Sequence, residues 1–260
     1  MTILDRLAEH AKKRVEEAKR IIPPETVREK ALALPRGSFA FENALKGPDI
    51  SFICECKKAS PSKGLIAPKF PYLEIAREYE AAGADCISVL TEPEWFLGSD
   101  SYLRKIAAEV SIPCLRKDFT VDEYMIFEAK LLGASAVLLI CSILSRAQLG
   151  EYLGLCDELG LSALTEAHTE EEVRMAMDAG ARMIGVNNRN LRDFSVDPEN
   201  SRRLRTLIPD DVLFVSESGV QNASDVAELR NIGADAVLVG ETLMRAPDKK
   251  RRLQELKGLL

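Results

Sequence analysis

Eight short apolar runs recur along this sequence, and each is followed by a segment whose apolar residues have helical spacing. The runs occupy residues 50–57, 85–92, 112–119, 135–142, 161–168, 182–189, 212–219 and 235–242. Four of them begin directly after a Gly-Ala pair, where glycine is the usual left-handed cap of a preceding helix. Steps of about 21 to 35 residues between runs are typical of parallel strands joined by helical crossovers. The repeat therefore predicts an alternating β/α fold.

The number of units favours one architecture. Eight β/α units within about 200 residues suggest a closed (β/α)8 barrel, the TIM barrel. An open doubly wound sheet is the alternative, but no G-x-G-x-x-G motif follows an early strand. Helix starts are indicated by polar pairs that can form capping boxes: Thr120 with Glu123, Ser145 with Gln148, Thr169 with Glu172, and Asn222 with Asp225.

Residues 1–48 have a different pattern from the repeat. Thr2 and Asp5 can cap a first helix, and Pro23-Pro24 ends it. Its apolar stripe consists of Leu4, Ala8, Ala11, Val15, Ala18 and Ile22. The stripe is too short for a coiled coil, so we expect this helix to lie on the outside of the barrel. We predict a single domain, with an N-terminal helical extension at 1–48 and a catalytic barrel at 49–260.

Charge and length argue against several classes of protein. The formal net charge is −6 with basic and acidic residues interleaved, so no extended positive field is available for nucleic acid. The longest apolar run, residues 134–144, falls short of the roughly 18 residues needed to span a bilayer. Because Met1 leads directly into a charged helical pattern, we expect no signal peptide and a cytoplasmic location.

Cysteine and histidine give no sign of a metal site. The six cysteines show no C-x-x-C motif, and five of them lie in or beside the predicted strands, which suits small core residues in a reducing compartment. His10 and His168 are the only histidines, which argues against a histidine-rich metal centre. We therefore expect no bound metal.

Polar side chains gather at the carboxyl ends of the predicted strands, which in a TIM barrel open onto one mouth. Residues two apart in a strand share a face, so Glu55 and Lys57 follow Ile53 on the inward side. The same parity applies to Lys117 and Glu166. The polar strand ends are Glu55, Lys57, Glu92, Lys117, Glu166, Asn187, Arg189, Glu217, Ser218, Gly240 and Glu241. We expect these groups to converge at the active site.

The first strand end has two interpretations. Glu55 and Lys57 can form a structural ion pair, or they can face a wet pocket, since an unpaired buried charge costs several kcal/mol. The loop that follows, residues 58–71, is long enough to be a lid or binding loop, and it carries Ser60 and Lys63 as donors to an anion. A decorated surface loop is the alternative.

The loops after the last two strands suggest an anion site. The seventh strand runs into Ser218-Gly219 and the eighth into Gly240-Glu241, each before a helix. In TIM barrels these loops commonly hold a phosphate with backbone N–H groups. Packing alone can require a glycine at such a turn, but glycines at both positions favour a phosphate site.

Lys117, Lys57, Glu55 and Glu166 would surround the space beside that phosphate. A lysine partly removed from water and near other cations can have its pKa lowered enough to act as a general acid near neutral pH. A carboxylate opposite can take the returning proton. Mutually neutralising ion pairs are the alternative, and His168 is expected to border the next helix rather than to take part in chemistry.

Two further groups have more than one interpretation. Arg189, next to Asn187, can pair with or stack on an anionic aromatic substrate, or it can form a salt bridge across the mouth. Trp95 and Phe96 follow the second strand, where they can wall an aromatic pocket or cover its rim. The sequence does not separate these alternatives.

Seven motifs, in this order and spacing, resemble the indole-3-glycerol phosphate synthase family: ECKKASPSKG, SVLTEPEWFLGS, LRKDF, LTEAHTEEE, GVNNRNL, VSESG and LVGETLMR. The resemblance covers nearly the whole chain. It implies ring closure, decarboxylation and dehydration of 1-(2-carboxyphenylamino)-1-deoxyribulose 5-phosphate in tryptophan biosynthesis, without metal or cofactor. This sugar phosphate is the implied partner. Nucleic acid and membranes are not implied, and other enzymes of the pathway are not indicated as partners.

The resemblance also implies roles for particular residues. Lys117 would be the general acid that protonates the ribulose carbonyl as the ring attacks, and Glu166 the general base of the dehydration. Lys57 would assist proton transfer. The residues implied to orient hydroxyls and lysines are Glu55, Asn187 and Glu217. The implied substrate-binding residues are Ser60, Phe119 and Arg189, and the implied phosphate contacts, mainly through backbone, are Ser218, Gly219, Gly240 and Glu241.

Other functions remain alternatives at this point. Another phosphate-binding barrel, such as phosphoribosylanthranilate isomerase or a Schiff-base aldolase, is one of them, and the aldolase would leave a borohydride-reducible adduct on Lys117 or Lys57. A catalytically inactive barrel that binds a partner enzyme is another. Such a barrel would lack at least one mouth residue, and none of the expected ones is missing.

Overall fold

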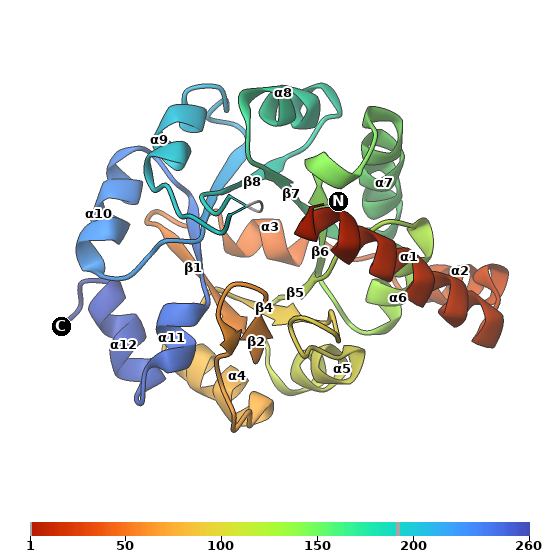
Figure 1. Cartoon of the computed structure of the whole chain (residues 1–260), viewed down its shortest axis with the longest axis horizontal. Helices are drawn as coiled ribbons and strands as arrows, with labels where there is room; N and C mark the ends of the chain where they lie inside the picture. The colour runs from red at the N-terminus through yellow and green to blue at the C-terminus, as the bar shows by residue number, and fades with distance from the viewer. Residues whose placement is uncertain (1, 191–192) are drawn as a thin grey trace.

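The computed structural model describes residues 2–190 and 193–260, and within them eight parallel strands form a closed barrel (Figure 1). The predicted TIM barrel is confirmed. The barrel strands are β1 Ser51–Cys56, β4 Cys86–Leu90, β5 Cys114–Lys117, β6 Ala136–Ile140, β7 Ser162–Ala167, β8 Met183–Asn187, β9 Leu213–Glu217 and β10 Ala236–Val239. They follow one another around the barrel in chain order, and β10 closes the ring on β1.

A ring of helices surrounds the barrel (Figure 1). They are α4 Tyr72–Ala81, α5 Asp100–Glu109, α6 Glu123–Leu131, α7 Arg146–Leu159, α8 Glu170–Asp178, α9 Glu199–Arg205, α10 Ala223–Asn231, α11 Glu241–Arg245 and α12 Lys249–Leu256, with a 3-10 turn η1 at Cys141–Ile143. The capping boxes predicted for α7 and α10 are present. The prediction for Thr120 was wrong, because the carboxylate of Asp122 caps α6 instead and Thr120 is buried.

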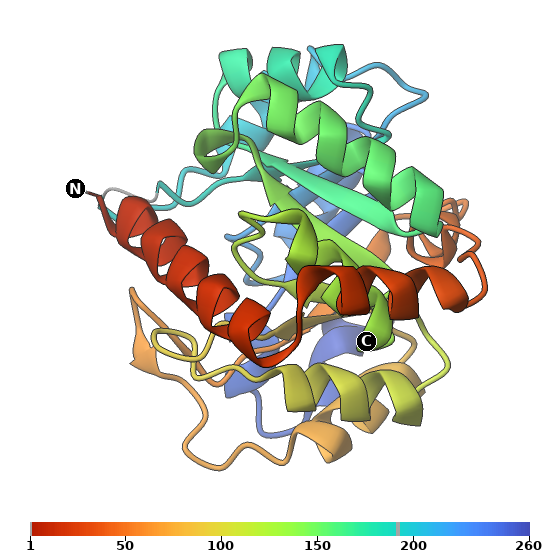
Figure 2. The same ribbon diagram turned by 90° about the vertical axis from the view of Figure 1, so that its right-hand side faces the viewer.

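Three helices precede β1: α1 Ile3–Ile21, α2 Pro24–Ala33 and α3 Ala40–Ala44. The predicted box of Thr2 and Asp5 begins α1, whose first turns reach the open end of the barrel rather than only its outside (Figures 1 and 2). Its buried residues are Leu7, Ala11 and Val15, so the buried stripe is shifted from the predicted one. The division of the chain at residues 48 and 49 stays a prediction.

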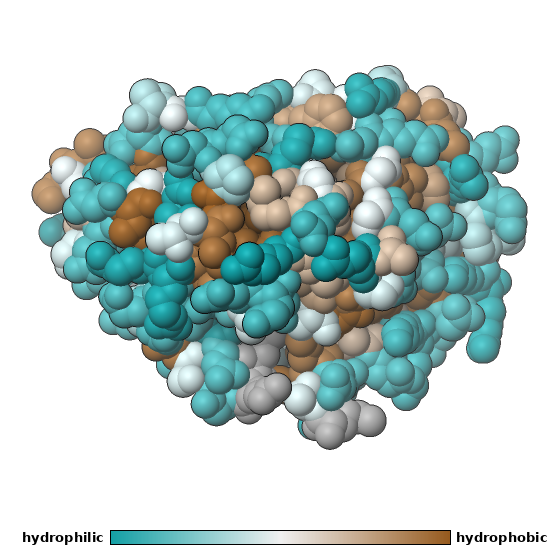
Figure 3. Space-filling model, turned by 90° about the horizontal axis from the view of Figure 1, so that it is seen from above, coloured by the Kyte–Doolittle hydropathy of each residue, from teal (hydrophilic) through white to brown (hydrophobic). Residues whose placement is uncertain are grey.

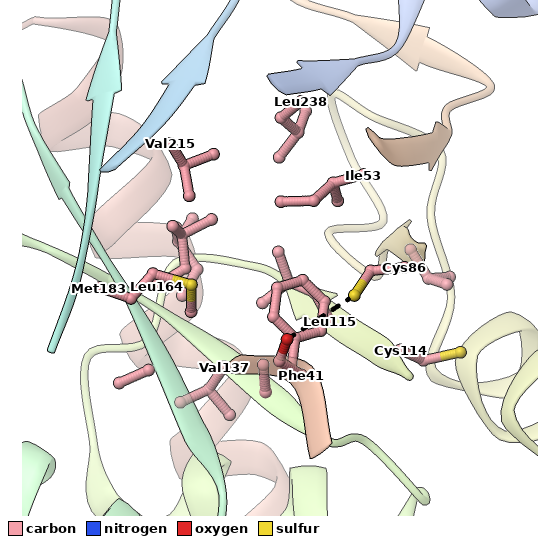
Figure 4. Close-up of a cluster of buried hydrophobic side chains, with 14 of the residues drawn as sticks. Phe41, Ile53, Cys86, Cys114, Leu115, Val137, Leu164, Met183, Val215 and Leu238 are labelled. Atoms are coloured by element: carbon pink, nitrogen blue, oxygen red, sulfur yellow. Dashed lines mark hydrogen bonds between the residues drawn. The ribbon is translucent and has the colours of Figure 1, made fainter. Parts of the chain in front are cut away.

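The side chains inside the barrel form layers, because every second residue of a strand points inward. Phe41 from α3 lies among inward-facing apolar side chains, and its carbonyl accepts a weak hydrogen bond from Cys86 at the start of β4 (Figure 4). The apolar layer around it includes Ile53, Leu115, Leu164, Val215 and Leu238. Two residues further along the same strands stand, in the same order, Glu55, Lys117, Glu166, Glu217 and Gly240. The core therefore aims this polar layer at the mouth.

The protein surface and the cysteines both indicate that the apolar residues lie mainly in the interior. On the face shown in Figure 3, hydrophilic residues surround smaller hydrophobic areas. Within residues 2–190 and 193–260, no helix combines the length and the hydrophobicity needed to cross a membrane. All six cysteines are buried and unbridged, and burial raises the pKa of the Cys54 thiol, as suits core residues.

Candidate active site

A cavity of about 680 Å³ opens at the carboxyl ends of the barrel strands. Apart from Glu92, the residues predicted for the site line it: Glu55, Lys57, Ser60, Lys117, Phe119, Glu166, Asn187, Arg189, Glu217, Ser218, Gly219, Gly240 and Glu241. They come from strands distributed around the whole barrel and from the loops that follow those strands. The fold thus brings together the residues that the sequence singled out, while their individual roles stay predictions.

Lys117, the last residue of β5, lies between two carboxylates. Its Nζ is 3.1 Å from Oε2 of Glu166 in β7 and 2.8 Å from Oε2 of Glu217 at the end of β9. The side chains of Lys117, Glu166 and Glu217 are only 12%, 4% and 2% exposed. Among the described residues, Oε1 of Glu217 is buried without a hydrogen-bond partner, so the cluster has spare acceptor capacity.

The neighbouring carboxylates set the charge of Lys117. Burial alone would lower its pKa, but Glu217, Glu166 and Glu55 together outweigh burial, and the pKa of Lys117 is raised. The expectation of a lowered lysine pKa is therefore wrong, because carboxylates rather than cations lie closest to the ammonium group.

The two carboxylates differ from each other. Burial raises the pKa of Glu217 to about 7, with Lys117 opposing the shift and Glu166 adding to it. Burial would also raise the pKa of Glu166, but the positive charges of Lys117 and His168 lower it overall. One carboxylate is thus firmly ionised at neutral pH, while the other is close to its titration midpoint.

Glu55 and Lys57 form an ion pair and also face the cavity, so both interpretations of the first strand end hold. Lys57 Nζ is 2.5 Å from Oε1 of Glu55, and the Ser88 hydroxyl donates to Oε2 of Glu55 at 3.4 Å. The two residues also line the cavity. Ser60 reaches the same cavity from a short hairpin formed by β2 Ala59–Ser60 and β3 Gly64–Leu65.

The loops after β9 and β10 lie next to each other because their strands are neighbours in the barrel. Ser218 has a φ of 66° and Gly219 a φ of 101°, so two successive residues adopt left-handed conformations. Such a conformation is uncommon for serine, and residues that hold one cluster at functional sites. Arg245 and Arg252 also line the cavity, but strand-end spacing could not reveal them because they lie in the last two helices and not at a strand end.

Aromatic residues divide between the cavity and its rim. Phe119 is buried and packs against Phe96 with ring centroids 6.1 Å apart, and both line the cavity. Trp95 instead packs edge-on against His10 of α1, with centroids 5.2 Å apart. Of the two alternatives for Trp95 and Phe96, Phe96 therefore walls the pocket and Trp95 covers its rim.

The end of β8 places Asn187 and Arg189 at the same cavity. The Arg189 backbone N–H donates to Oδ1 of Asn187 at 3.0 Å, and its guanidinium donates to the carbonyl of Phe194 at 3.1 Å. Leu191, which completes the motif GVNNRNL, lies outside the described residues.

One strand-end residue, Glu92, behaves differently from the sequence expectation. Glu92 does not converge with the others, because its buried carboxylate accepts backbone N–H groups of its own loop, from Glu94, Trp95 and Phe96. It shapes the loop instead.

His168 borders α8 as expected, with its backbone N–H donating to Oε2 of Glu172 at 2.6 Å, but its ring also lies between two carboxylates. Nε2 is 3.5 Å from Oε1 of Glu166, and Nδ1 is 3.4 Å from Glu172. Burial would lower the pKa of His168, but Glu172 and Glu166 raise it overall. Its position two residues after Glu166 was the signal that could have revealed this contact.

The N-terminal helix contributes to the cavity as well. Ile3 and Leu7 of α1 line it, and neither was predicted because the helix was expected on the outside of the barrel. Arg14 of the same helix makes a two-fold contact with the buried carboxylate of Asp118, directly after Lys117. Across the part of the chain that the structure describes, no group of three or more His, Cys, Asp or Glu side chains is arranged to hold a metal ion.

Comparison with known proteins assigns the chain to a family. A sequence profile described as indole-3-glycerol phosphate synthase matches residues 4–256. A protein of that name from Ruminiclostridium cellulolyticum is 57% identical over 98% of this chain and 99% of its own length, and one from Lachnoclostridium phytofermentans is 49% identical over 99% of this chain and 100% of its own length. The solved structure of 3-hexulose-6-phosphate synthase from Salmonella typhimurium is similar with a TM-score of 0.65, at 16% identity over 81% of this chain and 98% of that chain, which supports the barrel fold alone. The chain belongs to the indole-3-glycerol phosphate synthase family.

Proposed function

We propose that Lys117 and Glu166 are the general acid and the general base with which this chain carries out the reaction of its family. The chain is a carboxy-lyase of tryptophan biosynthesis, an indole-3-glycerol phosphate synthase like its relatives. Its substrate is the sugar phosphate 1-(2-carboxyphenylamino)-1-deoxyribulose 5-phosphate. The observation that carries the assignment is the 3.1 Å contact between Lys117 and Glu166 inside the cavity.

Ring closure joins the aromatic carbon that bears the carboxylate to the carbonyl carbon of the ribulose chain. The carbonyl electron pair moves onto its oxygen, and Lys117 delivers a proton there. Since the pKa of Lys117 is raised, the proton is present at neutral pH when that oxygen becomes basic. Carbon dioxide then leaves, and the electrons of the broken bond restore the aromatic ring.

Dehydration removes the hydroxyl formed in the first step together with a proton from the adjacent carbon. Glu166 is suited to accept that proton because Lys117 and His168 keep its pKa low. Lys57, paired with Glu55 at 2.5 Å, is positioned in the same cavity to assist the departure of the hydroxyl by supplying a proton. Acid and base steps of this kind typically contribute about 10² to 10⁴ in rate each.

The two ends of the substrate are held by different groups in this proposal. The phosphate lies at Ser218, Gly219, Gly240 and Glu241, mainly against backbone, with Arg245 and Arg252 supplying positive charge nearby. Ser60, Phe119 and Arg189 contact the carboxyphenyl end. A guanidinium there can pair with the carboxylate before it is lost.

The charge of Lys117 disfavours the aldolase alternative. A Schiff-base lysine must become a neutral amine before it attacks a carbonyl. Glu166 and Glu217 hold Lys117 in its protonated form instead.

An assay with the purified chain tests this function. Incubation with the carboxyphenylamino sugar phosphate should increase indole absorbance and release one carbon dioxide per turnover, without an adduct that borohydride can trap. Absence of indole product would contradict the proposal. We place the enzyme in the cytoplasm, where the buried thiols would remain reduced.

A further inference from the structure

Gly185 occupies an unusual place for a glycine, the middle of the inner face of β8. It is buried, and its φ is not among the positive values found in this chain, so the backbone does not require glycine there. A glycine inside a strand weakens the strand and often marks a close approach by another group. The reason for this glycine must therefore lie in what approaches it.

The group that approaches Gly185 is the carboxylate of Glu217. A Cβ added to Gly185 would meet Oε1 of Glu217 at well under the 3.0 Å below which real Cβ contacts essentially do not occur, and Leu164 Cδ1 at 3.0 Å. Along β9 the partner of Gly185 is Val215, whereas Glu217 pairs with Asn187 nearer the mouth. The Glu217 side chain thus folds back from its own level onto the space above Gly185.

This folded-back position determines what Glu217 can reach. From it, Oε2 accepts a 2.8 Å hydrogen bond from Lys117, while Oε1 stays buried without a partner among the described residues. A methyl group at residue 185 would occupy the place of Oε1. Because both oxygens belong to one planar carboxylate, displacing Oε1 would also move Oε2 away from Lys117 unless the strand itself shifts.

We propose that Gly185 is a positioning residue, whose missing side chain forms the seat that holds the Glu217 carboxylate against Lys117. The inference rests on the proposed function for its kinetic consequence, but not for its geometry. Gly240 forms a comparable seat, because a Cβ there would meet Oε1 of Glu55 at 2.5 Å and Nζ of Lys57 at 2.7 Å. Since Gly240 also belongs to the proposed phosphate site, Gly185 is the cleaner position to test.

The test compares Gly185→Ala in two backgrounds. In the wild-type background, we expect kcat to fall about 10²-fold, as displacement of a catalytic group by about 1 Å can do, with KM little changed. In a Glu217→Ala background the seat is empty, so adding Gly185→Ala should lower kcat less than about 2-fold further. The matched control is Gly154→Ala in α7, where an added Cβ meets nothing within 4 Å and kcat should not change.

Two kinetic outcomes would overturn the inference. One is a wild-type kcat for Gly185→Ala, and the other is an equal loss from Gly185→Ala in both backgrounds, which would assign the loss to packing against Leu164. A crystal structure of Gly185→Ala gives a readout independent of activity. We expect the 2.8 Å contact between Lys117 and Glu217 to be broken there, and its retention would contradict the inference.

If the wild-type chain forms no indole product, the proposed function fails, but the crystal structure still decides the role of Gly185. If Gly185→Ala does not fold, the Gly185→Ala, Glu217→Ala double variant is expected to fold, and its failure to do so would also assign the glycine to packing.

Discussion

Arg116 and Lys117 are neighbours in β5, and each is a cation with little exposure and two carboxylate partners, yet their surroundings differ. Arg116 faces away from the barrel axis, where it contacts Asp100 at 2.8 Å, Glu128 at 2.6 Å and the carbonyl of Met125 at 2.9 Å. Lys117 faces the cavity, where it contacts Glu166 and Glu217. In both residues burial would lower the pKa, and the carboxylates raise it overall. Charge state therefore does not distinguish them.

The difference lies in saturation and access. The outer cluster, Arg116 with Asp100 and Glu128, fills the layer between the strand and the helices. Arg116 makes a fourth contact there, with Thr91 at 3.4 Å. The inner cluster, Lys117 with Glu166 and Glu217, borders a cavity of about 680 Å³, and it leaves Oε1 of Glu217 without a hydrogen-bond partner among the described residues. Buried polar groups are normally satisfied, so unsatisfied ones beside a cavity indicate a site where a substrate completes the network. We infer that the outer cluster stabilises the fold and the inner one performs chemistry.

The largest expected effect separates these two roles at Lys117. Lys117→Ala should lower kcat about 10² to 10⁴-fold, because the proton donor is lost, while substrate affinity changes little. Lys117→Arg should be nearly as inactive, since a guanidinium keeps the charge but does not release its proton. The measurement is steady-state turnover alongside calorimetric binding of the substrate. An active Lys117→Ala variant would remove Lys117 from the acid role, and Lys105→Ala on the exposed side of α5 is the control.

Arg116→Met should produce the opposite result. Breaking a buried charge network typically costs about 3 to 5 kcal/mol of stability, and we expect the lower end because Asp100 and Glu128 are 41% and 27% exposed. Below its unfolding transition the variant should keep kcat within about 3-fold of the wild type. Urea unfolding monitored by circular dichroism checks this, with exposed Arg104→Met as a control expected to change stability by less than about 0.5 kcal/mol. A loss of kcat without a loss of stability would contradict the division of roles.

The two-residue period explains why the sequence could predict so much of this division. It gave opposite faces to adjacent residues, so the inward position of Lys117 and Glu166 followed from their spacing relative to Leu115 and Leu164. Convergence followed from the closed barrel, in which all strand ends share one mouth.

Properties that depend on distance between strands could not be predicted in the same way. The raised pKa of Lys117 results from two carboxylates on β7 and β9, and their separation from Lys117 is a product of barrel packing. The contact of α1 with the mouth depends on where the extension docks. The expectation that Glu92 joins the other strand ends was wrong because its carboxylate turns back to its own loop. Amphipathic patterns identify a buried face but not its partner.

The pH dependence of activity sharpens the comparison. The pKa of Glu217 is raised to about 7, so the free enzyme should lose kcat/KM as the pH falls below about 7 and this carboxylate gains a proton. Glu217→Gln cannot titrate, so its kcat/KM should be lower but flat across that limb. The outer Arg116 variant should retain the wild-type profile. An unchanged acid limb in Glu217→Gln would assign that limb to another group.

The smallest expected effect concerns His168, which lies beside the inner cluster but outside its closest contacts. The 3.5 Å between Nε2 and Oε1 of Glu166 is too long for a strong hydrogen bond, and Glu166 has Lys117 as its nearer partner at 3.1 Å. His168→Asn should therefore lower kcat by no more than about 3-fold, with a small upward shift of the pKa of Glu166 because the histidine charge no longer lowers it. Turnover measured across pH tests both parts. A loss of about 10²-fold, similar to the loss expected when a general acid or base is removed, would place His168 in the proton transfer itself and extend the inner cluster by one residue.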